Sequence, residues 1–210
     1  EILPNKNVIV IVLPDSAFGV LQSRAHAAWT GLTSSTLEDR QAYRPSDSFE
    51  TFPFPSRWME SESLLNTAIA VRRGRASVMA HTGLGLTGLY NRFHDPEETS
   101  ADILLLRALH DDMDRAVLDA YGWTDLPNTC EFLLDYEDEE EDDDDSGRTR
   151  QRKKPWRYRW PDDLRDEVLA RLLALNRDRA LQEERAGAGT RAGASAARMG
   201  PSKIVSQLPS

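Results

Sequence analysis

The sequence predicts an α+β protein that is mostly helical, and three observations support this fold class. Four stretches repeat apolar residues at spacings of three and four, which is the pattern of helices with one buried face. One β-branched run, Val8–Leu13, has the length and composition of a buried strand. Two other segments are charged or rich in alanine, glycine and serine and cannot bury enough apolar surface to fold. We therefore expect a small mixed α/β domain, then a helical C-terminal region with an acidic disordered loop and a disordered tail.

The first predicted helix follows the turn-forming segment Pro14–Ser16. Its apolar residues extend from Phe18 to Leu32 with helical spacing and predict one packed face. Arg24 is among the residues expected to face away from the core. Glycine and hydroxyl residues at 31–35 should end the helix.

The segment from Asp47 to Pro55 has two prolines around Phe54, so we expect it to be extended and to lie outside a central strand. Large aromatic side chains are usually buried, so the rings in and before this segment should pack against another part of the protein. Stacking on nucleic-acid bases is the alternative. The rings are those of Tyr43, Phe49, Phe52 and Phe54.

A second helix is predicted for Glu60–His81, where apolar residues recur among arginines. Three glycines follow it and should form a flexible joint. These are Gly83, Gly85 and Gly88.

The clearest helix begins after Thr99 or Ser100 and ends at Gly122, because an apolar stripe runs between a capping residue and a terminating glycine. The last helix begins at Pro161, with acids at its positive end, and frays near Arg185. The remaining residues have no apolar period and should be disordered.

The acidic run Asp135–Asp145 dominates the charge of the chain. It has ten acidic residues in eleven positions, and without those ten the formal net charge of −9 becomes +1. Net charge therefore does not exclude nucleic acid as a partner, because a polyanion responds to the basic surface within a Debye length, about 8–10 Å. A solvated linker is the expected role of the run, and competition with DNA for a basic surface is the alternative.

Cysteine usage and hydropathy indicate a soluble, cytoplasmic protein. Cys130 is the single cysteine, so we expect a small buried residue and neither an intramolecular disulfide nor a multi-cysteine zinc site. No basic-then-apolar leader begins the sequence, and Val8–Leu13 is too short to span a bilayer. We expect no membrane partner.

Two groups of basic residues are candidates for phosphate contact. The segment Arg148–Arg159, which includes Lys153 and Lys154, has seven basic residues in twelve positions with aromatic rings between them. This combination can bind phosphates and stack on bases, and a packed clasp of tryptophan and arginine is the alternative. The second group lies on the helix predicted for Glu60–His81. The alternative to phosphate contact is that these arginines only form a solvated face of that helix. It consists of Arg72, Arg73 and Arg75.

Three consecutive motifs follow the first predicted helix. They are Leu37-Glu38-Asp39-Arg40, Tyr43-Arg44-Pro45-Ser46 and Phe49-Glu50-Thr51-Phe52-Pro53-Phe54-Pro55. Their order resembles the end of the target-recognition region in MmeI-like restriction-modification proteins, in which one polypeptide carries an adenine-specific DNA methyltransferase. The stretch from Tyr121 to Asn176 is similar to C-terminal regions of the same class.

This resemblance implies that the chain reads DNA sequence. Glu38, Arg40 and Arg44 would contact bases, since glutamate can accept from cytosine N4 and arginine can bind guanine O6 and N7. The partners would be double-stranded DNA and an upstream methyltransferase domain, which would bind S-adenosylmethionine and methylate adenine N6 in restriction-modification or phage defence. From the residues alone, a solvated surface salt bridge is the alternative for Glu38 and Arg40.

No catalytic, cofactor or metal site is predicted in this chain. Adenine methylation needs a glycine-rich loop after a strand and an [N/D/S]-P-P-[Y/F/W] segment, and the sequence has neither. His110 and Asp114 lie one helical turn apart without a third metal ligand nearby, so they are expected to be an ordinary helix-surface pair. A non-catalytic protein-interaction module and an inactive, truncated methyltransferase remnant are the alternative functions.

Five parts are expected along the chain. Residues 1–56 would form the C-terminal part of the target-recognition domain, 57–134 a helical region, 135–154 a charged linker, 155–185 the C-terminal helix and 186–210 a disordered tail.

Overall fold

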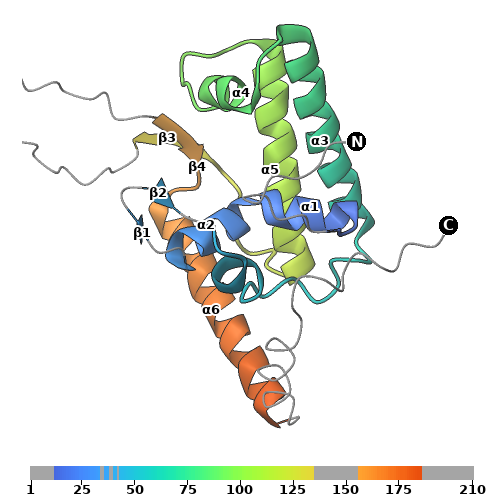
Figure 1. The fold of residues 1–210 in the computed structure, drawn as a ribbon, viewed down its shortest axis with the longest axis vertical. Helices are drawn as coiled ribbons and strands as arrows, with labels where there is room; N and C mark the ends of the chain where they lie inside the picture. Colours follow the sequence, from blue (N-terminus) through green and yellow to red (C-terminus); the bar gives the residue numbers. More distant parts are fainter. Residues whose placement is uncertain (1–11, 34–35, 38–39, 42, 135–155, 186–210) are drawn as a thin grey trace, which may run out of the picture.

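The computed structural model describes residues 12–33, 36–37, 40–41, 43–134 and 156–185. These residues form a mostly helical α+β fold, as predicted, and its strands form two small antiparallel sheets (Figure 1). The helices are α1 (Asp15–Gln22), α2 (Arg24–Thr33), α3 (Glu62–Thr82), α4 (Leu86–Phe93), α5 (Ala101–Tyr121) and α6 (Asp162–Arg185), with a π-helical turn at Pro45–Phe49. The strands are β1 (Thr36–Leu37), β2 (Arg40–Gln41), β3 (Glu131–Leu134) and β4 (Trp156–Arg159).

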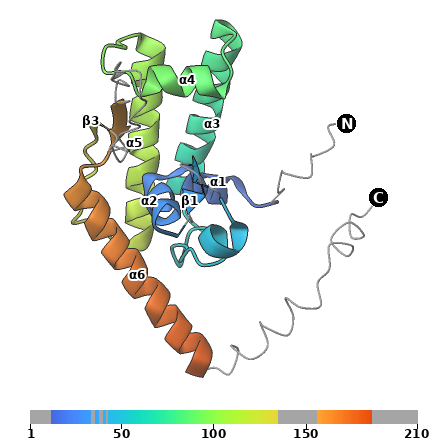
Figure 2. The same ribbon diagram turned by 60° about the vertical axis from the view of Figure 1, so that its left-hand side comes forward.

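Helix α5 is the centre of the structure and contacts α1, α2, α3 and α4. Helices α3 and α5 lie side by side, α4 lies near one end of this pair, and α6 extends away from it (Figures 1 and 2). The predicted stripe of α5 is buried at Ile103, Leu106, Met113 and Val117. Gly122 ends the helix with a φ of 80°, a left-handed conformation that favours glycine.

Two apolar cores stabilise this arrangement. The larger core combines α1, α2, the start of α3, the end of α5 and the first half of α6, so it draws residues from widely separated parts of the chain. The smaller core lies where α3, α4 and α5 meet, and Tyr158 of β4 packs against it. The largest fully buried side chains of the first are Trp29, Leu64, Leu118 and Leu172, and those of the second are Leu89, Ile103 and Leu106.

The single helix expected over residues 16–32 is two helices. The chain breaks at Ser23, whose backbone is extended with a ψ of 157°. Its hydroxyl donates to the carbonyl of Val20 at 2.7 Å and accepts from the backbone N–H of His26 at 3.3 Å, so one side chain ends α1 and begins α2. Of the predicted strand, Val12 and Leu13 are not in a strand, and Val8 to Ile11 lie outside the described residues.

The glycine-rich joint after α3 contains a helix that the sequence analysis missed. Gly83 does end α3, with a φ of 68°, but α4 begins only three residues later and includes Gly88. Burial of Leu89 and Phe93 against α5 stabilises this short helix and outweighs the low helix propensity of glycine.

The segment expected to be extended is partly helical, because Asp47 to Phe49 belong to the π-helical turn. Packing of its rings is confirmed for Phe52, which is buried, and for Phe54, which contacts the larger core. Tyr43 is 45% exposed, and its ring lies 5.9 Å from that of His26 on α2. The acidic run and the tail after residue 185 lie outside the described residues.

Candidate nucleic-acid interface

A small hairpin, β1 with β2, includes Arg40, one of the three residues predicted to contact bases. Strand β1 pairs antiparallel with β2, with Thr36 opposite Gln41 and Leu37 opposite Arg40. Glu38 lies outside the described residues, between the paired positions Leu37 and Arg40 in the chain.

Partly buried side-chain contacts hold the polypeptide on both sides of this hairpin. Before it, the Trp29 indole N–H donates to the Thr51 hydroxyl at 3.1 Å, and the Thr33 hydroxyl lies 3.2 Å from that of Ser48. After it, the ring of Tyr43 packs on α2 with its hydroxyl 3.5 Å from Nε2 of His26. Helix α2 and the π-helical turn are therefore joined by side-chain contacts on both sides of the hairpin.

Arg44 follows the hairpin and precedes the π-helical turn as its N-cap residue. Its side chain is exposed, so it is accessible to a partner. Arg44 therefore lies three residues after β2, the strand that contains Arg40.

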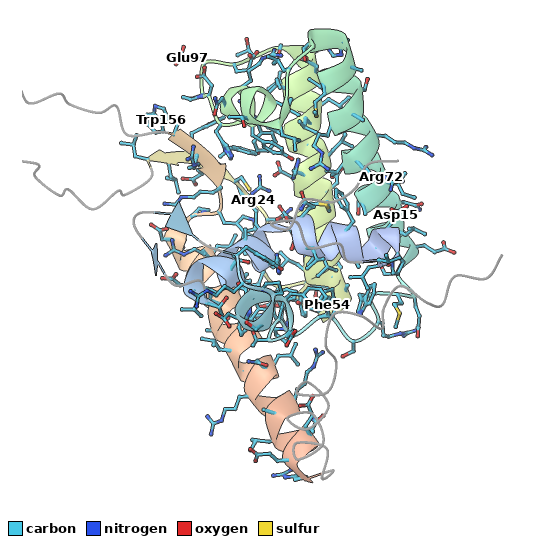
Figure 3. All side chains as sticks on the ribbon, viewed as in Figure 1. Asp15, Arg24, Phe54, Arg72, Glu97 and Trp156 are labelled. Carbon is cyan, nitrogen blue, oxygen red and sulfur yellow. The ribbon has the colours of Figure 1, made fainter. Side chains whose placement is uncertain are left out.

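The arginines of α3 do not join this group. Arg72 forms a 2.7 Å ion pair with Asp15 of α1, and Arg75 donates to Gln22 at 3.2 Å. Arg73 is exposed. In Figure 3, Arg72 and Asp15 lie on the side of the molecule opposite Trp156, so Arg72 and Arg75 connect α3 to α1 away from the two hairpins.

The second hairpin, β3 with β4, contributes a basic and aromatic cleft. Lys153 and Lys154 lie outside the described residues, and β4 begins at the exposed Trp156. A cleft of about 480 Å³ separates β4 from α2, α4 and α5. Its lining is Gln22, Arg24, Ala27, Tyr90, Phe93, His94, His110, Arg157, Tyr158 and Arg159.

A buried ion pair lies behind this cleft and holds α2 against α5. The guanidinium of Arg24 contacts Asp114 and is 2.9 Å from Asp111, and its backbone N–H donates to Asp114 at 2.8 Å. Burial opposes the charge on Arg24, but Asp114 keeps the pKa of this arginine above its usual value. The hydroxyl of Tyr158 donates to Asp111 at 2.7 Å, so β4 joins the same network.

Two sequence predictions are wrong at this network. Arg24 does not face away from the protein, since its side chain is only 14% exposed. His110 and Asp114 are not a surface pair, because both are buried, and the ring of His110 lies 3.1 Å from the Tyr90 hydroxyl. Position is the signal that could have revealed them: Arg107, His110 and Asp114 continue the buried stripe of α5 at spacings of three and four.

Burial keeps two histidines neutral. It lowers the pKa of His26 to about 4 and that of His110 to about 3, with Arg24 adding to the effect at His110. Burial also raises the pKa of Asp114 to about 6, which still leaves this carboxylate mainly charged at pH 7.

We expect the protein to become less stable as pH falls from 6.5 to about 4. In the unfolded chain both histidines bind protons near pH 6.5, whereas in the folded chain they do so only near pH 4 and pH 3, so protonation favours unfolding over this interval. Asp114 acts in the opposite direction below pH 6, and the net loss should be on the order of 3 kcal/mol. Urea unfolding at several pH values measures it, and His110→Asn should flatten the profile. An unchanged profile in that variant would show that His110 does not titrate in this way.

Cys130 is half-buried and packs against the larger core. Burial raises the pKa of its thiol, so it behaves as a small apolar residue. Within the described ranges, no three side chains of the metal-binding types gather into a potential metal site. None of the helices described is both long and apolar enough to cross a bilayer.

Comparison with known proteins yields one partial similarity. No family model and no curated protein matches the chain. Among solved structures, the chain is similar to the type IIL restriction-modification enzyme MmeI in complex with DNA, with 29% sequence identity and a TM-score of 0.44. The match covers 56% of this chain and 14% of the MmeI chain. The similarity therefore involves about half of this chain and a small part of a restriction-modification enzyme, and the TM-score does not establish a shared fold.

Proposed function

We propose that this chain recognises a specific sequence in double-stranded DNA. The observation that carries the proposal is the short hairpin β1–β2, with Glu38 and Arg40 in its sequence and Arg44 after it, next to partly buried contacts between α2 and the segment that follows the hairpin. A two-stranded ribbon fits the major groove, where glutamate can accept from cytosine and arginine can donate twice to guanine. The contacts that hold the ends of the hairpin favour affinity, because less conformational freedom is lost when the hairpin binds.

The family resemblance of the sequence motifs supports a more specific role. In this proposal the chain is the recognition portion of an N6-adenine DNA methyltransferase in a restriction-modification or phage-defence system, and it acts in the cytoplasm. An upstream methyltransferase domain binds S-adenosylmethionine and performs the chemistry, while this chain is not catalytic by itself. Arg72, Arg73, Arg75, Lys153 and Lys154 remain proposed phosphate contacts, of which Arg72 must exchange its ion pair with Asp15 for a phosphate.

A protein-interaction module is the second candidate function. The observation that favours it is the exposure of adjacent leucines on α5, Leu104 at 48% and Leu105 at 59%. Such a module would bind through apolar contacts, and its binding would depend little on salt.

The base-reading hypothesis predicts a change of specificity when the charges of the hairpin are exchanged. The double variant Glu38→Lys and Arg40→Asp should prefer a different sequence when duplexes are selected from a random library, because each residue would then match a different base edge. A good base contact is worth about 1–3 kcal/mol, so the original site should bind at least about fivefold less tightly. Glu60→Lys with Arg57→Asp is a matched control, since that exposed pair lies outside the hairpin. Identical selected sequences in the hairpin variant and the wild type would refute base reading by these residues.

A further inference from the structure

The cleft beside β4 has a lining suited to an anion. Three arginines and two histidines line it, and none of its lining residues is acidic, although the chain as a whole carries a formal charge of −9. Arginine donates from a planar fork that matches phosphate oxygens.

Arg157 and Arg159 supply the donors for such a ligand. They are two positions apart on β4, so their side chains leave the same side of the strand about 6.6 Å apart. Asp162 binds Nη1 of Arg159 at 2.6 Å and orients its guanidinium. The Nε of the same arginine is buried without a hydrogen-bond partner in the described part of the chain, and an oxygen acceptor that reached it would remove this penalty.

Arg24 and Tyr158 give the cleft a fixed wall. The guanidinium of Arg24 is held by Asp111 and Asp114 and lies 5.2 Å from the centre of the Tyr158 ring. Asp111 and Asp114 pair with Arg24 and Asp162 pairs with Arg159, so a phosphate in the cleft would share both guanidinium groups with these carboxylates.

The cleft and the first hairpin are close enough to meet one DNA duplex. Helix α2 begins at the cleft with Arg24 and ends three residues before β1. Its ten residues span about 15 Å, which is less than half of one duplex turn of about 34–36 Å. A backbone phosphate in the cleft would therefore set the position of the duplex while the hairpin reads bases.

We infer that the cleft between β4 and α2 binds a phosphate of the DNA backbone through Arg157 and Arg159. This inference rests on the proposed function and adds a phosphate site to it. Both arginines belong to the basic segment Arg148–Arg159 that the sequence suggested for phosphate contact, and the structure adds the cleft that they line.

The test measures how salt affects DNA binding by the full chain. Fluorescence anisotropy with one fixed duplex gives the slope of log affinity against log salt for the wild type and for Arg157→Gln with Arg159→Gln. Each lost phosphate contact should reduce the slope by about 1, and each should weaken binding by about tenfold at low salt. The preferred sequence should stay the same, because phosphate contacts do not read bases. Arg177→Gln with Arg185→Gln removes the same charge from exposed positions of α6 and should leave the slope nearly unchanged.

Two further measurements keep the test decisive. Arg157→Lys with Arg159→Lys retains the charges and should recover most of the slope, even if the glutamine variant folds poorly. Inorganic pyrophosphate should shift the NMR signals of the His94 and His110 rings in the wild type but not in the glutamine variant.

Pyrophosphate shifts without a change in the DNA slope would mean that the cleft takes free phosphate, and the inference would be overturned. An unchanged slope with retained sequence preference would overturn the inference alone, whereas absence of DNA binding by the wild type would overturn the proposed function as well.

Discussion

Replacement of Asp114 by alanine should lower the free energy of unfolding by about 3–5 kcal/mol. The carboxylate of Asp114 is 1% exposed and binds both the guanidinium and the backbone N–H of Arg24. Its removal leaves a largely buried arginine with only Asp111, and an uncompensated buried charge is costly. Because the pair holds the first turn of α2 against α5, the base of the β1–β2 hairpin should also lose rigidity.

Urea unfolding at pH 7 measures this loss, with Asp112→Ala as the control. Asp112 lies on the same helix but is exposed, so its replacement should change the stability by less than about 0.5 kcal/mol. The double variant Arg24→Met with Asp114→Leu should recover much of the loss, since it removes both buried charges. Equal stability of the Asp112 and Asp114 variants would rule out a structural role for the pair.

Replacement of Arg107 by methionine should cost about 3 kcal/mol or more. Arg107 is 6% exposed and donates to three carbonyls at 2.9 Å or less. These carbonyls belong to Phe93, Asp95 and Glu98 in the turn that joins α4 to α5. Methionine retains much of the apolar stem but leaves the carbonyls without their charged donor, so the turn between α4 and α5 should open first.

Hydrogen exchange locates this effect while thermal unfolding gives its size. Amides of residues 94–100 should exchange faster in Arg107→Met, whereas those of α6 should keep their protection. Arg165→Met, at a half-exposed position of α6, should leave both regions unchanged. Uniform loss of protection across the chain, or none, would contradict the assignment of Arg107 to this turn.

Helices could be predicted where apolar residues recurred regularly and a residue typical of a helix end followed them. Helix α5 combines both, because its stripe is regular and Gly122 follows it. The break at Ser23 escaped prediction because a serine hydroxyl replaced helix hydrogen bonds within an unbroken apolar pattern. Helix α4 was not predicted because its glycines give the local sequence a low helix propensity. Its stability comes from the burial of Leu89 and Phe93 in the folded chain.

The candidate site was only partly predictable for a different reason. Arg40 lies in β2 and Arg44 follows it, and these places follow from the short distance between the two residues in the sequence. The partner of Arg24, by contrast, is Asp114, ninety positions further along the chain, and no local pattern connects them. Arg157 and Arg159 belonged to a recognised basic segment, but the cleft they share with α2 exists only in the folded chain.

The most direct test of DNA recognition is the equilibrium binding of the folded chain to random-sequence duplex DNA at low and moderate salt. Recognition through several phosphates predicts measurable binding at low salt and a steep loss of affinity as salt rises, since bound counterions are released from DNA. Folded protein that binds no duplex, or that binds it equally at both salt concentrations, would contradict the account.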